Sequence, residues 1–103
     1  MAGVGFLRFE TVVRPQKAEA VCLKLFELGV VLDLQAQEVL GSGRRADGPT
    51  DDPVIDTLPK ALIAGYVESD DIEAVVDTIQ THARSGRIGD GKVWIYPITA
   101  TTA

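Results

Sequence analysis

The chain has 103 residues and a formal net charge of −5, with 46% hydrophobic and 24% charged residues. This length and composition suit one soluble globular domain over residues 1–103. The acidic balance argues against a nucleic-acid partner, no apolar run is long enough for a membrane-embedded protein, and the single cysteine suits a cytoplasmic localisation.

The N-terminal part predicts a strand and then a helix. Residues 5–13 alternate, which places Leu7, Phe9, Thr11 and Val13 on one face and Arg8 and Glu10 on the other. Pro15 suits the first turn of a helix, and Gly29 fits a left-handed stop. The buried stripe of that helix is expected to comprise Ala18, Val21, Cys22, Leu25 and Leu28.

Residues 30–40 predict a second strand. Val39 leaves the phase of the alternation, so we expect a bulge near Gln37 or Glu38. Residues 41–57 then form the longest irregular segment, rich in glycine and charge. A segment of this length inside a small domain is typical of a functional loop.

The C-terminal half predicts a strand, a helix and a strand. The third strand covers about residues 58–68 and is interrupted by Gly65. Asp70–Glu73 resembles a capping box at the start of a helix that Gly86 would end, and residues 93–98 predict a fourth strand. The buried stripe of this helix is expected to comprise Ile72, Val75, Val76, Ile79 and Ala83.

The element order βαββαβ predicts an α+β protein of the ferredoxin-like type, an antiparallel sheet with two helices on one face. The other face would carry leucine and isoleucine side chains and Trp94, and it would be exposed to water in a monomer. Because a large exposed apolar face normally marks an interface, we expect this face to bind other subunits.

A glycine-rich stretch before the fourth strand is a candidate anion site. Gly89 and Gly91 allow successive backbone N–H groups to converge on one point. Arg87 and Lys92 flank that point with positive charge, and Asp90 adds a carboxylate. The pattern predicts a phosphate-binding loop, although the same residues also make ordinary hairpin turns.

Residues 85–95 resemble the C-terminal signature of the PII signal-transduction proteins, and the resemblance continues upstream in the same order. It covers the end of the first strand (Val12–Pro15), the start and end of the family's T-loop (Gly41–Arg44 and Leu58–Lys60), and the second helix (Asp71 and Val76–Ile79). The resemblance implies a homotrimer that binds an adenine nucleotide in clefts between subunits, with residues 41–57 as the T-loop. The features described below look most like the short PII-like branch associated with carboxysomes and inorganic-carbon uptake.

Carried over by position, the resemblance implies a nucleotide site made by Gly41, Gly43, Arg44, Arg87, Ile88, Gly89, Asp90, Gly91 and Lys92. Lys60 stands near the family's effector site, and Arg45 offers a charge for a small anion such as bicarbonate. From the residues alone, the Arg44–Arg45 pair is either a soluble loop tip or an anion clamp. The resemblance also implies a protein target, which could be a transporter, an enzyme or a carboxysome component.

The chain departs from the family pattern at several positions. Arg45 replaces the glutamine that helps to hold magnesium and 2-oxoglutarate, and Ala64 replaces a glutamate that contacts the nucleotide. The loop has no tyrosine for uridylylation, and the chain ends at Ala103, before the family's paired C-terminal arginines. Fewer cations disfavour the most charged ligand, so we expect ADP or AMP to bind better than ATP, without the usual response to 2-oxoglutarate.

Enzymatic and metal functions have little support in the sequence. His82 stands off the apolar stripe of its helix, Cys22 is expected in the core, and neither belongs to a catalytic or ligand cluster. We therefore expect no catalytic residues, no bound metal and no cofactor. The alternatives are a nitrogen-regulatory PII-type sensor, a trimeric metal-tolerance protein of related fold and, last, a small metabolic enzyme.

Overall fold

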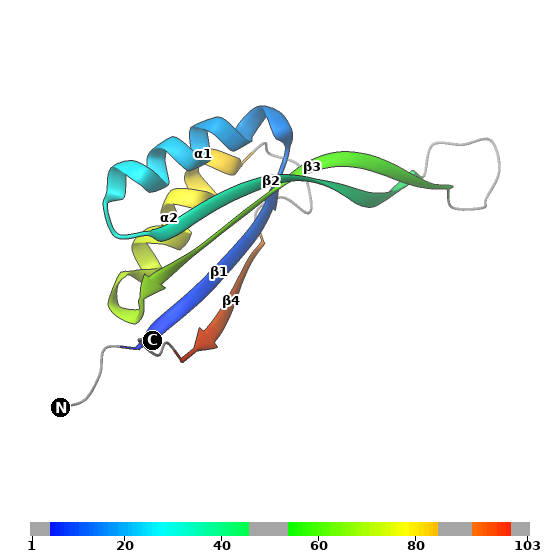
Figure 1. Ribbon diagram of the computed structural model, residues 1–103. Coiled ribbons are helices and arrows are strands. Elements are labelled where there is room, and N and C mark those ends of the chain that lie inside the picture. The colour runs from blue at the N-terminus through cyan, green and yellow to red at the C-terminus, as the bar shows by residue number, and fades with distance from the viewer. Residues whose placement is uncertain (1–4, 46–53, 85–91, 100–103) are drawn as a thin grey trace.

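The computed structural model describes residues 5–45, 54–84 and 92–99 (Figure 1). Its elements follow the expected order of strands and helices along the chain. They are β1 (Phe6–Val13), α1 (Pro15–Leu28), β2 (Leu32–Arg45), β3 (Val54–Glu68), a 3₁₀ turn (Ser69–Asp71), α2 (Ile72–Ala83) and β4 (Val93–Ile98).

The strands form a single sheet in the order β2-β3-β1-β4, and each neighbouring pair is antiparallel. Both helices lie on the same side of this sheet (Figure 1). The predicted ferredoxin-like α+β fold is therefore confirmed, and its sheet has a helix-covered face and an open face.

The core lies between the helices and the covered face. Strand β1 contributes Phe9, Thr11 and Val13, which are buried, as the alternation of residues 5–13 predicts. The rest of the core comes from the predicted helix stripes and from β3, in the residues Val21, Leu25, Ala61, Ile63, Val67, Val75, Ile79 and Ala83. Ala18, Cys22 and Ile72 pack against this core and are partly buried.

Strands β2 and β3 extend well beyond the rest of the sheet. Val13, the last residue of β1, pairs with Ala61, so the residues of β3 that precede Ala61 pair only with β2. The register continues from Val39 opposite Lys60 to Arg45 opposite Val54. We call this two-stranded projection, residues 39–45 and 54–60, the arm; it leaves the body of the molecule at one end of the sheet (Figure 1).

The expectation that residues 41–57 are irregular throughout is wrong. Gly41–Arg45 and Val54–Thr57 belong to the two strands, and residues 46–53 lie outside the described residues. Gly-rich, polar residues do not look like a strand, but a continuous backbone ladder along the arm holds them extended.

Two further details of the strands differ from the expectation. The irregularity in β2 lies between Leu32 and Gln35, where Asp33 has a positive φ of 50°, and not near Gln37 or Glu38. Gly65 does not interrupt β3, because it pairs with Phe9 in an unbroken register. A Cβ at this glycine would stand 2.8 Å from Cγ1 of Val31 and 3.0 Å from Cζ of Phe9, so the close packing of the core requires glycine here.

The helix ends follow the sequence in part. Pro15 occupies the first turn of α1, and Gly29 ends it with a φ of +71°, as expected. The prediction of a capping box is wrong. Asp71 precedes α2 and makes no side-chain capping hydrogen bond, because a 3₁₀ turn already leads into the helix. Helix α2 ends at Ala83, earlier than expected, and Gly86 lies outside the described residues.

Candidate functional site

Three of the predicted site residues, Gly41, Lys60 and Lys92, lie at one end of the sheet. This end holds the last residues of β1, the first residue of β4 and the base of the arm. One row of paired residues crosses the whole sheet here, from Ala36 through Ile63 and Thr11 to Val93. The antiparallel arrangement brings together segments that are far apart in the sequence.

A buried hydroxyl anchors the residue that follows the glycine-rich stretch. Thr11 Oγ1 donates a hydrogen bond of 2.8 Å to the backbone carbonyl of Lys92. Thr11 is fully buried, and it is the only buried polar residue in the described part of the chain. Lys92, which is itself exposed, is thereby held beside the end of β1. The sequence analysis placed Thr11 on this face of the strand but gave it no role in the site; the available signal was a hydroxyl residue in the middle of an apolar face.

Gly41 and Lys60 lie side by side at the base of the arm. Gly41 pairs with Leu58 and Val39 pairs with Lys60, so the two residues occupy neighbouring register positions on one face of the ribbon. A Cβ on Gly41 would stand 3.1 Å from Cγ of Lys60. The missing side chain at Gly41 therefore makes room for the lysine stem, and the structure joins a predicted nucleotide residue to a predicted effector residue.

The other predicted arm residues follow in register. Gly43 lies opposite Asp56, Arg44 opposite Ile55 and Arg45 opposite Val54. The arm backbone thus carries Arg44 and Arg45 away from Lys60 toward the far end of the ribbon. Sequence reasoning placed these arginines in a loop, whereas the structure places their backbone in a strand.

Five predicted nucleotide residues lie outside the described residues. They are Arg87, Ile88, Gly89, Asp90 and Gly91. The structure fixes what flanks them: Arg84, an exposed residue directly after α2, and Lys92, directly before β4.

Two hollows on the described surface differ in the charged residues that line them. A hollow of about 330 Å³ lies at the arm base and is lined by Pro15, Ala18, Ala36, Gln37, Glu38, Lys60 and Ala61. A larger hollow of about 600 Å³ between α2 and β4 is lined by Ile72, Glu73, Ala74, Val76, Asp77, Gln80 and Ile95. The larger hollow has two carboxylates and no cation, so it does not suit a phosphate. The smaller hollow, which includes Lys60, lies beside the predicted site.

The two side chains considered for catalysis occupy ordinary positions. His82 is partly exposed in the last turn of α2. Cys22 packs against the core from α1, and burial raises the pKa of its thiol. In residues 5–45, 54–84 and 92–99, no three histidine, cysteine, aspartate or glutamate side chains come close enough together to hold a metal. None of the helices in these ranges has the length and hydrophobicity needed to cross a bilayer.

Comparison with protein families gives a clear result. The model of the nitrogen regulatory protein P-II family matches residues 7–103. The chain belongs to this family. The resemblance inferred from residues 85–95 and from the upstream segments is therefore confirmed, and the chain is a member of a family of regulatory signalling proteins.

Sequence relatives and solved structures agree with this assignment. A nitrogen fixation nifHD region glnB-like protein 1 from Methanococcus maripaludis is 39% identical over 87 residues, which are 84% of this chain and 82% of that protein. A nitrogen regulatory protein P-II from Rhodospirillum rubrum is 34% identical over 96 residues, which are 88% of this chain and 84% of that protein. The PII protein of Arabidopsis thaliana, solved bound to citrate, is 28% identical with a TM-score of 0.71, over 93% of this chain and 79% of that one. A B. subtilis GlnK–ATP complex is 24% identical with a TM-score of 0.73, over 92% of this chain and 84% of that one, and it supports the fold.

Proposed function

We propose that this PII-family chain is a homotrimeric sensor that binds an adenine nucleotide between subunits and reports energy or inorganic-carbon status to a protein target. ADP or AMP is the preferred nucleotide, and bicarbonate is the proposed co-ligand. The domain covers residues 1–103, and residues 41–57 are its T-loop equivalent, most of which is the paired arm. The chain acts as a regulator in the cytoplasm and not as an enzyme.

The observation that carries this proposal is the convergence of the two predicted anion-binding segments at one end of the sheet. Thr11 holds Lys92 beside the end of β1. Gly41 on β2 and Lys60 on β3 lie at the arm base, on the other side of β1 from β4 in the order β2-β3-β1-β4. A polyphosphate needs several cations and N–H groups around one point, and the presence of Lys60 and Lys92 at this end of the sheet supports such a site.

The open face of the sheet supports the homotrimer. Trp94, Tyr96 and Val12 are all more than two-fifths exposed in the single chain. Burying such side chains against other subunits stabilises an assembly through the hydrophobic effect.

A nitrogen-regulatory sensor is the second candidate. Two relatives that are 34–39% identical carry nitrogen-related names, one of them from a nitrogen fixation region. This candidate predicts binding of 2-oxoglutarate together with ATP. Arg45 in place of glutamine and Ala64 in place of glutamate argue for the first candidate.

Calorimetric titration of the purified chain separates the two candidates. We expect ADP and AMP to bind more tightly than ATP, bicarbonate to strengthen ADP binding, and 2-oxoglutarate to have no effect in the presence of ATP and magnesium. The opposite pattern, tight ATP binding that 2-oxoglutarate strengthens, would support the nitrogen-regulatory candidate. A chain that ignores all three nucleotides at millimolar concentration would overturn both.

A matched pair of lysine variants locates the site. K92A removes a cation beside the glycine-rich stretch and should weaken ADP binding about tenfold, because a charge-assisted contact is lost. K24A removes the same charge from an exposed ion pair with Glu27 on α1 and should leave the ADP affinity unchanged. Equal effects of the two variants would show that only net charge matters, which contradicts a site at Lys92.

A further inference from the structure

The centre of the open face carries an ion pair between Arg8 and Glu10, beside the exposed side chains of Trp94, Tyr96 and Val12. Arg8 Nε lies 2.9 Å from Glu10 Oε1, and Arg8 Nη1 donates a hydrogen bond of 2.9 Å to Tyr66 Oη. The Arg8 guanidinium also lies 5.3 Å from the centre of the Tyr66 ring. These three residues form a cluster, which we call the Arg8 cluster.

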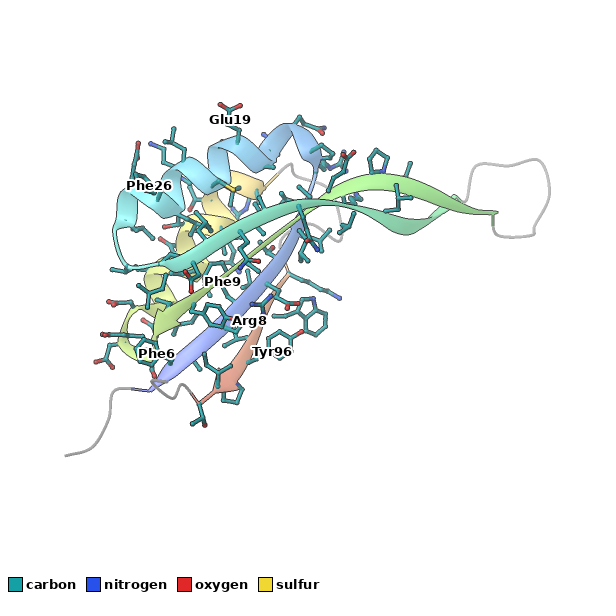
Figure 2. The ribbon with its side chains drawn as sticks, viewed as in Figure 1. Phe6, Arg8, Phe9, Glu19, Phe26 and Tyr96 are labelled. Carbon is teal, nitrogen blue, oxygen red and sulfur yellow. The ribbon has the colours of Figure 1, made fainter. Side chains whose placement is uncertain are left out.

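The register places the Arg8 cluster among aromatic side chains. Arg8 pairs with Tyr66 on β3 and with Tyr96 on β4, and Glu10 pairs with Trp94 on β4. Figure 2 shows Arg8 and Tyr96 on the neighbouring strands β1 and β4. Any partner that covers Trp94 and Tyr96 must therefore also cover the two charges.

Covering these charges sets a chemical requirement on the partner. The side chains of Arg8 and Glu10 are 27% and 28% exposed, so each still contacts water in the single chain. The hydrogen bonds within the cluster use Nε and Nη1 of Arg8 and Oε1 of Glu10, which leaves Nη2 and Oε2 to be satisfied from outside the cluster. Burying these atoms without such partners is unfavourable, because each loses its hydrogen bonds to water.

The same face of a second copy meets this requirement. It offers a carboxylate to the guanidinium and a guanidinium to the carboxylate, together with apolar side chains for Trp94. We propose that, in the homotrimer proposed above, Arg8 of one copy pairs with Glu10 of the next across the open face. The proposal rests on the homotrimer under Proposed function and adds the charge pair that selects the partner. Head-to-tail pairing of this kind gives a closed ring when the rotation between copies is one third of a turn.

Charge reversal in two separate preparations tests this pairing. R8E leaves two negative charges on the open face, and E10R leaves two positive charges. Each variant alone should dissociate, with an assembly constant weaker by about tenfold or more, since like charges then oppose each other. Mixing the two variants should restore assembly, because at least two of the three contacts in a mixed ring of three join opposite charges.

Trp94 reports the assembly directly, because it is the only tryptophan in the chain and is 56% exposed in the single subunit. Sedimentation measures the assembled fraction, and the blue shift of Trp94 emission measures burial of the open face. Two results would overturn the proposal. The first is that R8E alone or E10R alone assembles to the same extent as the wild type. The second is that the mixture of R8E and E10R stays dissociated while the double variant R8E/E10R assembles. The second result would mean that the ion pair acts only within one chain.

Controls separate this inference from the proposed function. K24E reverses an exposed charge on α1 and should leave assembly unchanged. If circular dichroism shows that R8E or E10R does not fold, the neutral variants R8Q and E10Q replace them, and unchanged assembly of both would overturn the pairing. A monomeric wild-type chain would refute the proposed trimer itself, whereas a trimeric wild type whose charge variants fail to complement each other would refute only the pairing.

Discussion

The two faces of the sheet are built from the same strands but are stabilised differently. On β1, Phe9 and Thr11 point into the helix-covered core and are fully buried. The residues between and beside them, Arg8, Glu10 and Val12, lie on the open face and remain accessible. One alternating set of side chains therefore holds the single chain folded, and the other set is available for assembly.

The largest contrast is expected between Phe9 and Val12. F9A removes a fully buried ring and leaves a cavity, so it should lower the free energy of unfolding by about 3–5 kcal/mol. V12A removes a smaller side chain that is 45% exposed and should leave the urea midpoint of the dilute chain almost unchanged. Urea unfolding followed by circular dichroism measures both, and similar losses for the two variants would contradict the division between the faces.

A smaller effect is expected at the polar position of the covered face. T11V keeps the shape of the side chain but leaves the Lys92 carbonyl without its hydrogen bond, at a cost of about 1 kcal/mol. If Thr11 positions Lys92 for phosphate binding, ADP affinity should fall about fivefold, whereas T11S, which keeps the hydroxyl, should restore it.

Comparing stability with affinity decides what Thr11 does. A purely structural role would lower the free energy of unfolding of T11V without changing the ADP dissociation constant measured below the unfolding temperature. That outcome would contradict a positioning role, and so would T11S behaving like T11V in the ADP titration.

The smallest effect concerns Cys22 on the core side of α1. Burial disfavours the thiolate, so the pKa of this thiol lies above its usual value of 9.0 in the folded chain. The pH at which alkylation by iodoacetamide reaches half its maximum rate should therefore be higher for the folded chain than for the chain in urea. The associated stability is fully present below the unfolded pKa and is lost as the pH rises through the folded pKa.

C22S provides the control for this measurement, because it removes the only cysteine in the chain. Labelling that persists in C22S would show that the assay reports another group. Equal half-rate pH values for the folded and unfolded chains would contradict burial of the thiol.

Prediction from sequence was most successful where apolar side chains repeat with the period of a strand or a helix, because this repeat indicates which residues are buried. The alternation in residues 5–13 identified Phe9 and Val13 as core residues, and the helical spacing identified Val21, Leu25 and Ile79. It failed where the backbone ladder and not burial decides the conformation. The polar, glycine-rich residues 41–45 have no period to indicate a strand, yet they pair along the whole arm.

The candidate site was predicted only in part. The sequence named Gly41, Lys60 and Lys92 as separate elements of a motif. Neither the contact between Gly41 and the stem of Lys60 nor the hydrogen bond from Thr11 could be foreseen, since both join residues on different strands. The same holds for the link from Arg8 to Tyr66, which spans 58 positions along the chain.

The sequence by itself determined the order of strands and helices, the side of the first strand that faces the helices, and the family. Those properties depend on local periodicity and on short motifs, which neighbouring residues encode. Tertiary structure alone decided the extent of the arm, the anchoring of Lys92 by Thr11, and the position of the Arg8 cluster at the centre of the open face. These features depend on which strands become neighbours and in which register, and that choice is made by packing of the whole sheet against its two helices.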